Sequence, residues 1–188
     1  MGVVAVRRAV FLDRDGVLNE VVLVNGKPHP PASVEGVKVL PGVVDAVATL
    51  RREGFCLVVV TNQPDVARGT TPRAAVDAIN DHLRGLLRLD GVETCFHDDA
   101  DGCGCRKPAP GLLLQSAARL KIDLSRSYMV GDRWRDIAAG RRANCRSILI
   151  GSGYGETFRD MPDASCESLW VATQWILSRE GSAHAGVG

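Results

Sequence analysis

Short apolar runs alternate along the chain with longer segments whose apolar residues recur at helical spacing. The apolar runs predict five strands, at 9–12, 55–60, 92–97, 128–130 and 147–150. Between and after them, apolar residues three or four positions apart predict helices at about 43–52, 72–89, 110–120, 134–142 and 165–179. The run from Phe55 to Val60 is almost wholly β-branched, which is typical of a strand buried on both faces. The alternation predicts an α/β fold, a Rossmann-like parallel sheet flanked by helices on both faces.

Two stretches fall outside this alternation. Residues 25–41 hold four prolines, which predicts an irregular excursion over the mouth of the sheet that lines the substrate site. Residues 181–188 are mainly Gly, Ser and Ala, and we expect them to form a disordered tail. The 188 residues suit one domain, which we place at residues 1–180.

The composition is that of a globular protein and narrows the classes of partner. Hydrophobic residues make up 45% and charged residues 24%, which excludes a disordered or fibrous chain. Lys plus Arg (23) nearly cancels Asp plus Glu (22), so no broad positive field is available for nucleic acid or an anionic membrane. No apolar run approaches the ~20 residues of a membrane span, and the N-terminus lacks a secretory signal. We therefore expect a cytoplasmic protein, and a monomer by default.

Polar side chains follow three of the predicted strands. They are Asp13 and Asp15 after the first strand, Thr61 and Asn62 after the second, and Asp132 with Asp136 after the fourth. Parallel strands bring their carboxyl ends to one edge of a sheet, so we expect these groups to meet there. Alone, a pair of loop aspartates is more often an N-cap or a turn.

Four stretches in this order, 13–19, 61–63, 106–108 and 131–136, resemble the four motifs of the haloacid dehalogenase (HAD) superfamily of phosphatases. The resemblance covers residues 10–150 and implies a single HAD-like phosphatase domain with a minimal cap. It also implies Mg²⁺-dependent hydrolysis of a phosphate monoester through an aspartyl-phosphate. Taken singly, the Thr of the second motif and the Lys of the third would be a strand-end residue and a solvated cation; the four ordered motifs reverse that reading.

The resemblance gives each motif a role. Asp13 would attack phosphorus, and Asp15 would protonate the leaving alcohol and then activate water. Mg²⁺ would be held by Asp13, the backbone carbonyl of Asp15 and Asp132, with Asp136 just outside the ligands. The phosphoryl group would be bound by the Thr61 hydroxyl, the Asn62 backbone N–H and Lys107.

Four metal-ligand residues lie between positions 95 and 105. They form two close pairs, Cys95 with His97 and Cys103 with Cys105. Three thiolates and an imidazole complete a tetrahedral set, which predicts a structural Zn²⁺ separate from the Mg²⁺ site. The alternative is a group of reduced cysteines in a strand and turn. The other cysteines, Cys56, Cys145 and Cys166, are expected to be small buried hydrophobic residues.

The Cys-x-His and Cys-x-Cys-Arg-Lys-Pro pattern narrows the resemblance to the HAD subfamily that contains heptose bisphosphate phosphatases and histidinol-phosphate phosphatase domains. The first hypothesis for the substrate is therefore D-glycero-D-manno-heptose 1,7-bisphosphate, losing its C7 phosphate. The second is histidinol phosphate or another small sugar phosphate, and a remote alternative is an inactive binding protein. Arg106 is the candidate to bind the far end of the substrate, the end away from the phosphate that is removed, and Arg68 is a weaker candidate. Histidinol phosphate would call for an acidic residue near Arg106, such as Asp98 or Asp99.

Overall fold

The computed structural model describes residues 6–24 and 27–184. Its main sheet has six parallel strands in the order β5-β4-β1-β6-β7-β8, and a smaller antiparallel sheet pairs β2 with β3. The strands are β1 (Ala9–Leu12), β2 (Val22–Val24), β3 (Lys27–His29), β4 (Cys56–Asn62), β5 (Gly91–Cys95), β6 (Tyr128–Gly131), β7 (Arg146–Ile150) and β8 (Ala164–Cys166). The α-helices are α1 (Val43–Arg52), α2 (Arg73–Leu87), α3 (Gly111–Leu120), α4 (Trp134–Arg142) and α5 (Leu169–His184). The parallel α/β fold predicted from the sequence is confirmed.

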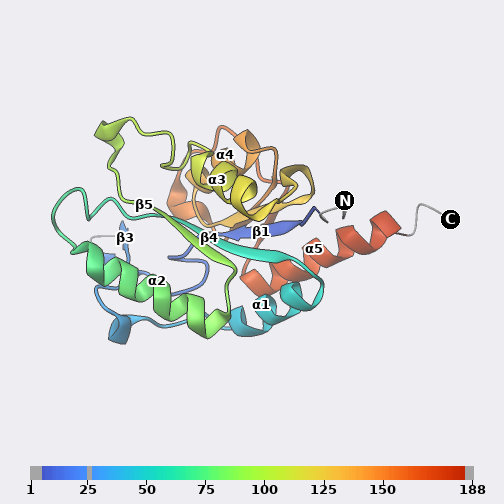
Figure 1. Ribbon diagram of the computed structural model, residues 1–188, viewed down its shortest axis with the longest axis horizontal. Coiled ribbons are helices and arrows are strands. Elements are labelled where there is room, and N and C mark those ends of the chain that lie inside the picture. The colour runs from blue at the N-terminus through green and yellow to red at the C-terminus, as the bar shows by residue number, and fades with distance from the viewer. Residues whose placement is uncertain (1–5, 25–26, 185–188) are drawn as a thin grey trace.

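Helices cover the main sheet on both faces, with α3 and α4 on one side and α1, α2 and α5 on the other (Figure 1). Side chains of a strand point alternately to the two faces. Val10 and Leu12 of β1 accordingly join the core under α1, α2 and α5, whereas Ala9 and Phe11 join the core under α3 and α4. Burial on both faces explains the unbroken apolar runs in the sequence.

The strand register brings the predicted polar groups to one edge. Leu12 is level with Val59 of β4 and with Val130 of β6. The next residue, Asp13, donates its backbone N–H to the carbonyl of Val130 at 2.9 Å. The chain therefore leaves β1, β4 and β6 at the same edge, where it carries Asp13, Thr61 and Asp132.

The C-terminal part differs from the sequence prediction in two elements. Ser165, predicted to lie at the start of the last helix, belongs instead to the edge strand β8, and α5 begins at Leu169. The helix starts there because the Ser168 hydroxyl accepts a hydrogen bond from the N–H of Val171 at 3.3 Å, as an N-cap does. Strand β8 is only three residues long and reads Ala-Ser-Cys, so it lacks the β-branched pattern that reveals the other strands.

The predicted excursion at 25–41 is more regular at its start than its prolines suggested. Strand β3 lies within it and pairs with β2, and a short 3-10 helix (η1) spans Val34–Gly36. Residues 25 and 26 lie outside the described residues. Strand β3 contains one of the four prolines, Pro28, because both strands of a two-stranded sheet are edges, where a strand tolerates proline.

The predicted disordered tail begins too early. Helix α5 continues through His184, and residues 185–188 lie outside the described part of the chain. Gly181 keeps a helical backbone and lacks the positive φ of a C-terminal cap. Near that end, Glu180 accepts a hydrogen bond from the Tyr128 hydroxyl at 2.7 Å and pairs with Arg8, which ties the helix to the sheet. None of the helices in the described residues is long and apolar enough to cross a membrane.

Candidate active site

A cavity of about 290 Å³ opens at the edge of the sheet where β1, β4 and β6 end. All the residues that the sequence predicts for catalysis, phosphate binding, Mg²⁺ and the far end of the substrate line this cavity: Asp13, Asp15, Thr61, Asn62, Arg106, Lys107, Asp132 and Asp136. Val21, just before β2, joins Pro28 and His29 of β3 and the following Pro30 in its wall. Residues up to 123 positions apart in sequence, from Asp13 to Asp136, thus face one space.

Lys107 lies at the centre of the charged groups. Its ammonium is 2.8 Å from Asp13 Oδ1 and 2.5 Å from Asp136 Oδ1, and the residue is only 2% exposed. Burial lowers the pKa of Lys107, but attraction to Asp13 and Asp136 outweighs burial and leaves the pKa raised. Lys107 therefore stays charged and aims a positive group at the Asp13 carboxylate.

The three buried carboxylates of Asp13, Asp132 and Asp136 exceed the positive charge beside them. Their oxygen atoms lie within 4.8 Å of one another. Burial raises the pKa of Asp13 to about 6 despite the opposing attraction of Lys107. Burial and repulsion from Asp13 and Asp136 raise the pKa of Asp132 to about 8. One carboxylate oxygen, Asp132 Oδ1, is buried without a hydrogen-bond partner in the described structure. A hard divalent cation with oxygen ligands suits this charge and this vacant acceptor.

Asp136 is fully engaged by protein groups. Its Oδ1 pairs with Lys107, and its Oδ2 accepts the backbone N–H of Arg133 at 3.0 Å, at the start of α4. Gly131 leaves room for this carboxylate, because a Cβ there would be 2.1 Å from the Cβ of Asp136. Both oxygens of Asp136 therefore already interact with protein donors.

Asp15 is held by donors on both oxygens. Oδ1 accepts from Asn19 Nδ2 at 2.9 Å, and Oδ2 accepts from Gln63 Nε2 at 2.7 Å and from the Arg14 guanidinium at 2.9 Å. The Gln63 amide also donates to Thr61 Oγ1 at 2.9 Å. A hydroxyl that accepts in this way keeps its own proton to donate, so Thr61 can still offer a hydrogen bond to a ligand.

The side chain of Asn62 fixes the backbone of Lys107. Asn62 Nδ2 donates to the Lys107 carbonyl and Asn62 Oδ1 accepts the Lys107 N–H, each at 3.0 Å. The resemblance implied a role only for the backbone N–H of Asn62. The side-chain contact ties the end of β4 to the loop that carries Lys107.

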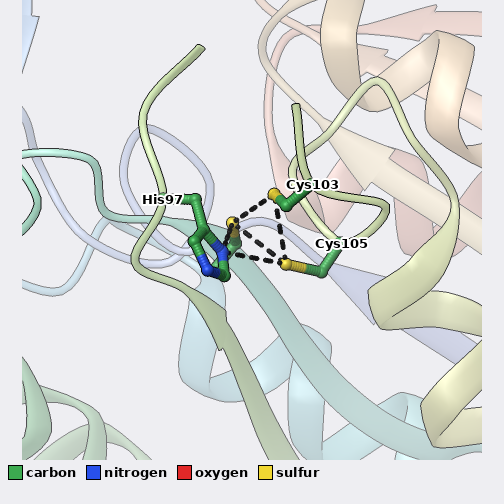
Figure 2. A group of neighbouring side chains, drawn as sticks. His97, Cys103 and Cys105 are labelled. Atoms are coloured by element: carbon green, nitrogen blue, oxygen red, sulfur yellow. Dashed lines mark hydrogen bonds between the residues drawn. The ribbon is translucent and has the colours of Figure 1, made fainter. Parts of the chain in front are cut away.

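The four predicted zinc ligands lie together beside the cavity. Figure 2 shows the side chains of His97, Cys103 and Cys105 pointing toward one another. The Sγ atom of Cys105 is 3.3 Å from that of Cys95, 3.4 Å from that of Cys103 and 3.3 Å from His97 Nδ1. The Sγ atom of Cys95 is 3.7 Å from that of Cys103. A tetrahedral zinc with Zn–S bonds of about 2.3 Å would set its sulfurs about 3.8 Å apart, so the group is nearly arranged for the metal.

Arginines on the cavity rim are paired with carboxylates of the loop between the zinc-ligand pairs. Asp99 Oδ1 accepts from Arg106 Nε at 2.8 Å and from Arg135 at 2.6 Å. Asp98 accepts two hydrogen bonds from Arg68, at 2.7 and 2.8 Å. The two hydrogen-bonding arginines hold the pKa of Asp99 far below its usual range. Acidic side chains do lie near Arg106, and their charges are already neutralised.

Several contact residues were not assigned from the sequence. Gln63, Arg14 and Arg135 stand inside the quoted motifs but were given no role, and Arg135 is the second residue of α4. Tyr154, whose hydroxyl donates to Asp132 Oδ2 at 2.8 Å, lies in a loop after β7 with no motif around it. For Gln63, Arg14 and Arg135, position beside a predicted site residue offered a signal, whereas for Tyr154 the sequence offered none.

Known proteins are similar to this chain in both sequence and architecture. The HAD-hydrolase-like family model matches residues 104–172. D-glycero-beta-D-manno-heptose-1,7-bisphosphate 7-phosphatase of Escherichia coli K12 is 36% identical over 176 residues, 87% of each chain. The protein of that name from Pseudomonas aeruginosa is 35% identical over 154 residues, 79% of this chain and 84% of its own. The crystal structure of D,D-heptose 1,7-bisphosphate phosphatase from B. bronchiseptica, complexed with magnesium and phosphate, matches with a TM-score of 0.79 and 31% identity, over 92% of this chain and 99% of that one.

Proposed function

This chain belongs to the haloacid dehalogenase superfamily of phosphatases, and from that membership we propose that it removes the C7 phosphate of D-glycero-D-manno-heptose 1,7-bisphosphate. The observation that carries the chemistry is the buried group of Asp13, Lys107, Asp132 and Asp136 at one cavity. The choice of substrate rests on the relatives, which bear that activity in their names at 34–36% identity.

In the proposed reaction, an Asp13 oxygen attacks phosphorus, the P–O bond to the sugar breaks, and Asp15 gives its proton to the departing alkoxide. Asp15 then takes a proton from water, which attacks the aspartyl-phosphate and releases inorganic phosphate. Thr61 donates its hydroxyl and Asn62 its backbone N–H to the phosphoryl oxygens, and Lys107 supplies positive charge beside Asp13.

Asp13, the Asp15 backbone carbonyl and Asp132 would hold Mg²⁺. When bound, Mg²⁺ would offset the repulsion between the carboxylates and the phosphate dianion. The unpartnered Asp132 Oδ1 and the surplus of carboxylates support this assignment. Asp136, with both oxygens engaged, would keep Lys107 in place.

The cluster of Cys95, His97, Cys103 and Cys105 would hold a structural Zn²⁺. Its contacts of 3.3–3.7 Å support a closed tetrahedral site without an open position for water. The metal would fix the loop that continues into Arg106 and Lys107.

Arg106 would bind the second phosphate of the substrate from the cavity rim. Its side chain is only 11% exposed, and it already donates to Asp99 and to the His97 carbonyl at 3.2 Å. A guanidinium in this setting suits a planar or tetrahedral anion. Arg68 would contribute less, because Asp98 and Asp65 both pair with it.

Histidinol phosphate is the second candidate, because the acidic residues that it would call for do lie beside Arg106. Each of them is nevertheless paired with arginine, Asp99 with Arg106 and Arg135 and Asp98 with Arg68. An ammonium group would have to displace an arginine to reach either carboxylate. Two arginines, Arg106 and Arg135, share the single carboxylate of Asp99, and this local excess of positive charge favours a substrate whose far end is anionic.

A panel of substrates tests the proposal. We expect Mg²⁺-dependent phosphate release with a higher kcat/KM for the heptose bisphosphate than for histidinol phosphate or simple sugar monophosphates.

Asp13→Asn tests the nucleophile. The substitution should lower kcat by about 1,000-fold or more, because the attacking oxygen is lost, while the thermal unfolding profile remains that of a folded protein. A strong preference for histidinol phosphate would overturn the first substrate, and turnover retained in Asp13→Asn would exclude Asp13 as the nucleophile.

We also propose that the enzyme works as a cytoplasmic monomer. Three of the six cysteines gather in one candidate metal-binding cluster and all six are free thiols, which supports a reducing compartment. The nearly balanced charge supports the expectation that neither nucleic acid nor a membrane is a partner. Light scattering coupled to gel filtration checks the monomer directly, and a mass of twice 20.1 kDa would contradict it.

A further inference from the structure

The two oxygens of the Asp132 carboxylate have different surroundings. Oδ2 accepts a hydrogen bond from the Tyr154 hydroxyl at 2.8 Å, whereas Oδ1 is buried and has no partner in the described structure. The residue as a whole is 4% exposed. One oxygen is therefore anchored by the protein and the other is left for a ligand.

Tyr154 reaches Asp132 from outside the catalytic cavity. It does not line that cavity; it lines a second, mainly apolar cavity of about 470 Å³, to which Asp132 also contributes. Asp132 thus forms part of the wall between the two spaces. A hydrogen bond from the second space can orient the carboxylate without taking up room that phosphate needs.

The backbone conformations of Gly16 and Tyr154 allow the contact between Tyr154 and Asp132. Gly16 has φ +86°, and a Cβ there would lie 1.9 Å from Asp132 Oδ2 and 3.1 Å from the Tyr154 hydroxyl. Tyr154 itself has φ 53° and ψ 28°, a left-handed conformation that is uncommon for an aromatic residue. Strained conformations of this kind persist where the surrounding contacts hold them, and they cluster at functional sites.

We propose that Tyr154 is a positioning residue for Asp132: its hydroxyl holds Oδ2 so that Oδ1 is presented to the divalent cation. This role rests on the proposed function, in which Asp132 is a Mg²⁺ ligand. Hydrogen bonds to the distal atoms of metal ligands fix the orientation of those ligands, and their loss typically lowers metal affinity 10- to 100-fold.

Tyr154→Phe tests the role, because it removes only the hydroxyl of a residue that is 40% exposed. We expect the Mg²⁺ concentration for half-maximal activity to rise about tenfold, with kcat at saturating Mg²⁺ within about twofold of wild type. Calorimetric titration with Mg²⁺ in the absence of substrate should show the same loss of affinity. Tyr128→Phe is the matched control. The Tyr128 hydroxyl bonds to Glu180 and Arg146, and Tyr128 starts β6 and does not line the catalytic cavity, so the Mg²⁺ constants of this variant should not change.

The outcomes separate this proposal from the proposed function. An unchanged Mg²⁺ constant in Tyr154→Phe, with wild-type turnover still dependent on Mg²⁺, overturns the positioning role alone. A lower melting temperature with an unchanged Mg²⁺ constant overturns it as well, because it shows that Tyr154 serves only stability. Wild-type turnover that is independent of Mg²⁺, with no Mg²⁺ bound in the titration, overturns the proposed metal site and this role with it.

Discussion

Gly16 shows how closely the backbone approaches the Asp132 carboxylate. A methyl group at this position would have to displace the carboxylate, because the ideal Cβ lies 1.9 Å from Oδ2. A shift of about 1 Å in a catalytic group can cost on the order of 100-fold in rate. We expect Gly16→Ala to lower kcat/KM by about that factor, measured as phosphate release at saturating Mg²⁺.

Gly54 provides the matched control for this substitution. Its φ of +81° is close to the +86° of Gly16, but nothing lies within 4 Å of its ideal Cβ. Gly54→Ala should therefore cost only the left-handed strain, about 1–2 kcal/mol in urea unfolding, and keep wild-type kcat/KM. Equal kinetic effects of the two substitutions would show that backbone strain, and not the Asp132 contact, governs activity.

At the level of single residues, the sequence identified groups that stand next to strand ends and missed those brought in by tertiary contact. Asp13, Thr61 and Asp132 lie within two residues of the ends of apolar runs, so their meeting at one cavity follows from parallel topology. Tyr154 is 22 residues beyond Asp132, in a loop whose path no periodicity determines. The pairing of Asn62 with the Lys107 backbone was likewise hidden, because it depends on side-chain geometry.

Among the elements, β4 and β5 link the cysteine cluster to Lys107. Cys95, at the end of β5, is the register partner of Asn62, at the end of β4, and Asn62 holds the backbone of Lys107. Cys105 precedes Lys107 by two residues in the same loop. The proposed Zn²⁺ would therefore fix Lys107 from both directions along the chain.

Cys103→Ser tests this link. We expect zinc content, measured by atomic absorption, to fall from about one per chain to well below one, because a ligand thiolate is lost. The melting temperature should fall, and kcat should fall about tenfold or more as Lys107 loses its fixed position. Cys145→Ala, a change in a buried cysteine outside the cluster, should lower stability and keep both zinc and kcat. Wild-type protein purified without chelators and free of zinc would favour reduced cysteines instead.

Longer strands and helices with a regular apolar pattern were predicted from the sequence, and very short strands were not. Strands β1, β4, β6 and β7 carry runs of apolar residues, and helices α1 to α4 carry regular apolar spacing, so the sequence locates them within a few residues. Strands β2, β3 and β8 have three residues each, too few to establish any period. They form because a neighbouring strand supplies hydrogen bonds, which is information from the whole fold.

For the whole molecule, the parallel sheet places three loops from distant parts of the chain around one cavity, and ion pairs join them. Arg68 from the loop after β4 binds Asp98, and Arg135 of α4 binds Asp99. Partners 30 and 36 residues apart leave no local signal in the sequence. The alternation of strands and helices predicted the sheet. The ion pairs of the rim arginines could be identified only from the three-dimensional structure.

Asp99 occupies the two rim arginines that a second phosphate would use. Its carboxylate contacts Arg106 and Arg135 at 2.8 and 2.6 Å while its side chain remains 57% exposed, so an incoming anion must compete with it. Exposed ion pairs are worth up to about 1 kcal/mol, which corresponds to roughly fivefold in affinity. We therefore expect Asp99→Asn to lower KM for a bisphosphate substrate by about two- to fivefold, and to leave KM for a sugar monophosphate unchanged. Steady-state kinetics on the two substrates supply the comparison within one variant. A higher KM for the bisphosphate would show instead that Asp99 holds the arginines in a binding arrangement, and an equal change for both substrates would place Asp99 outside recognition of the second phosphate.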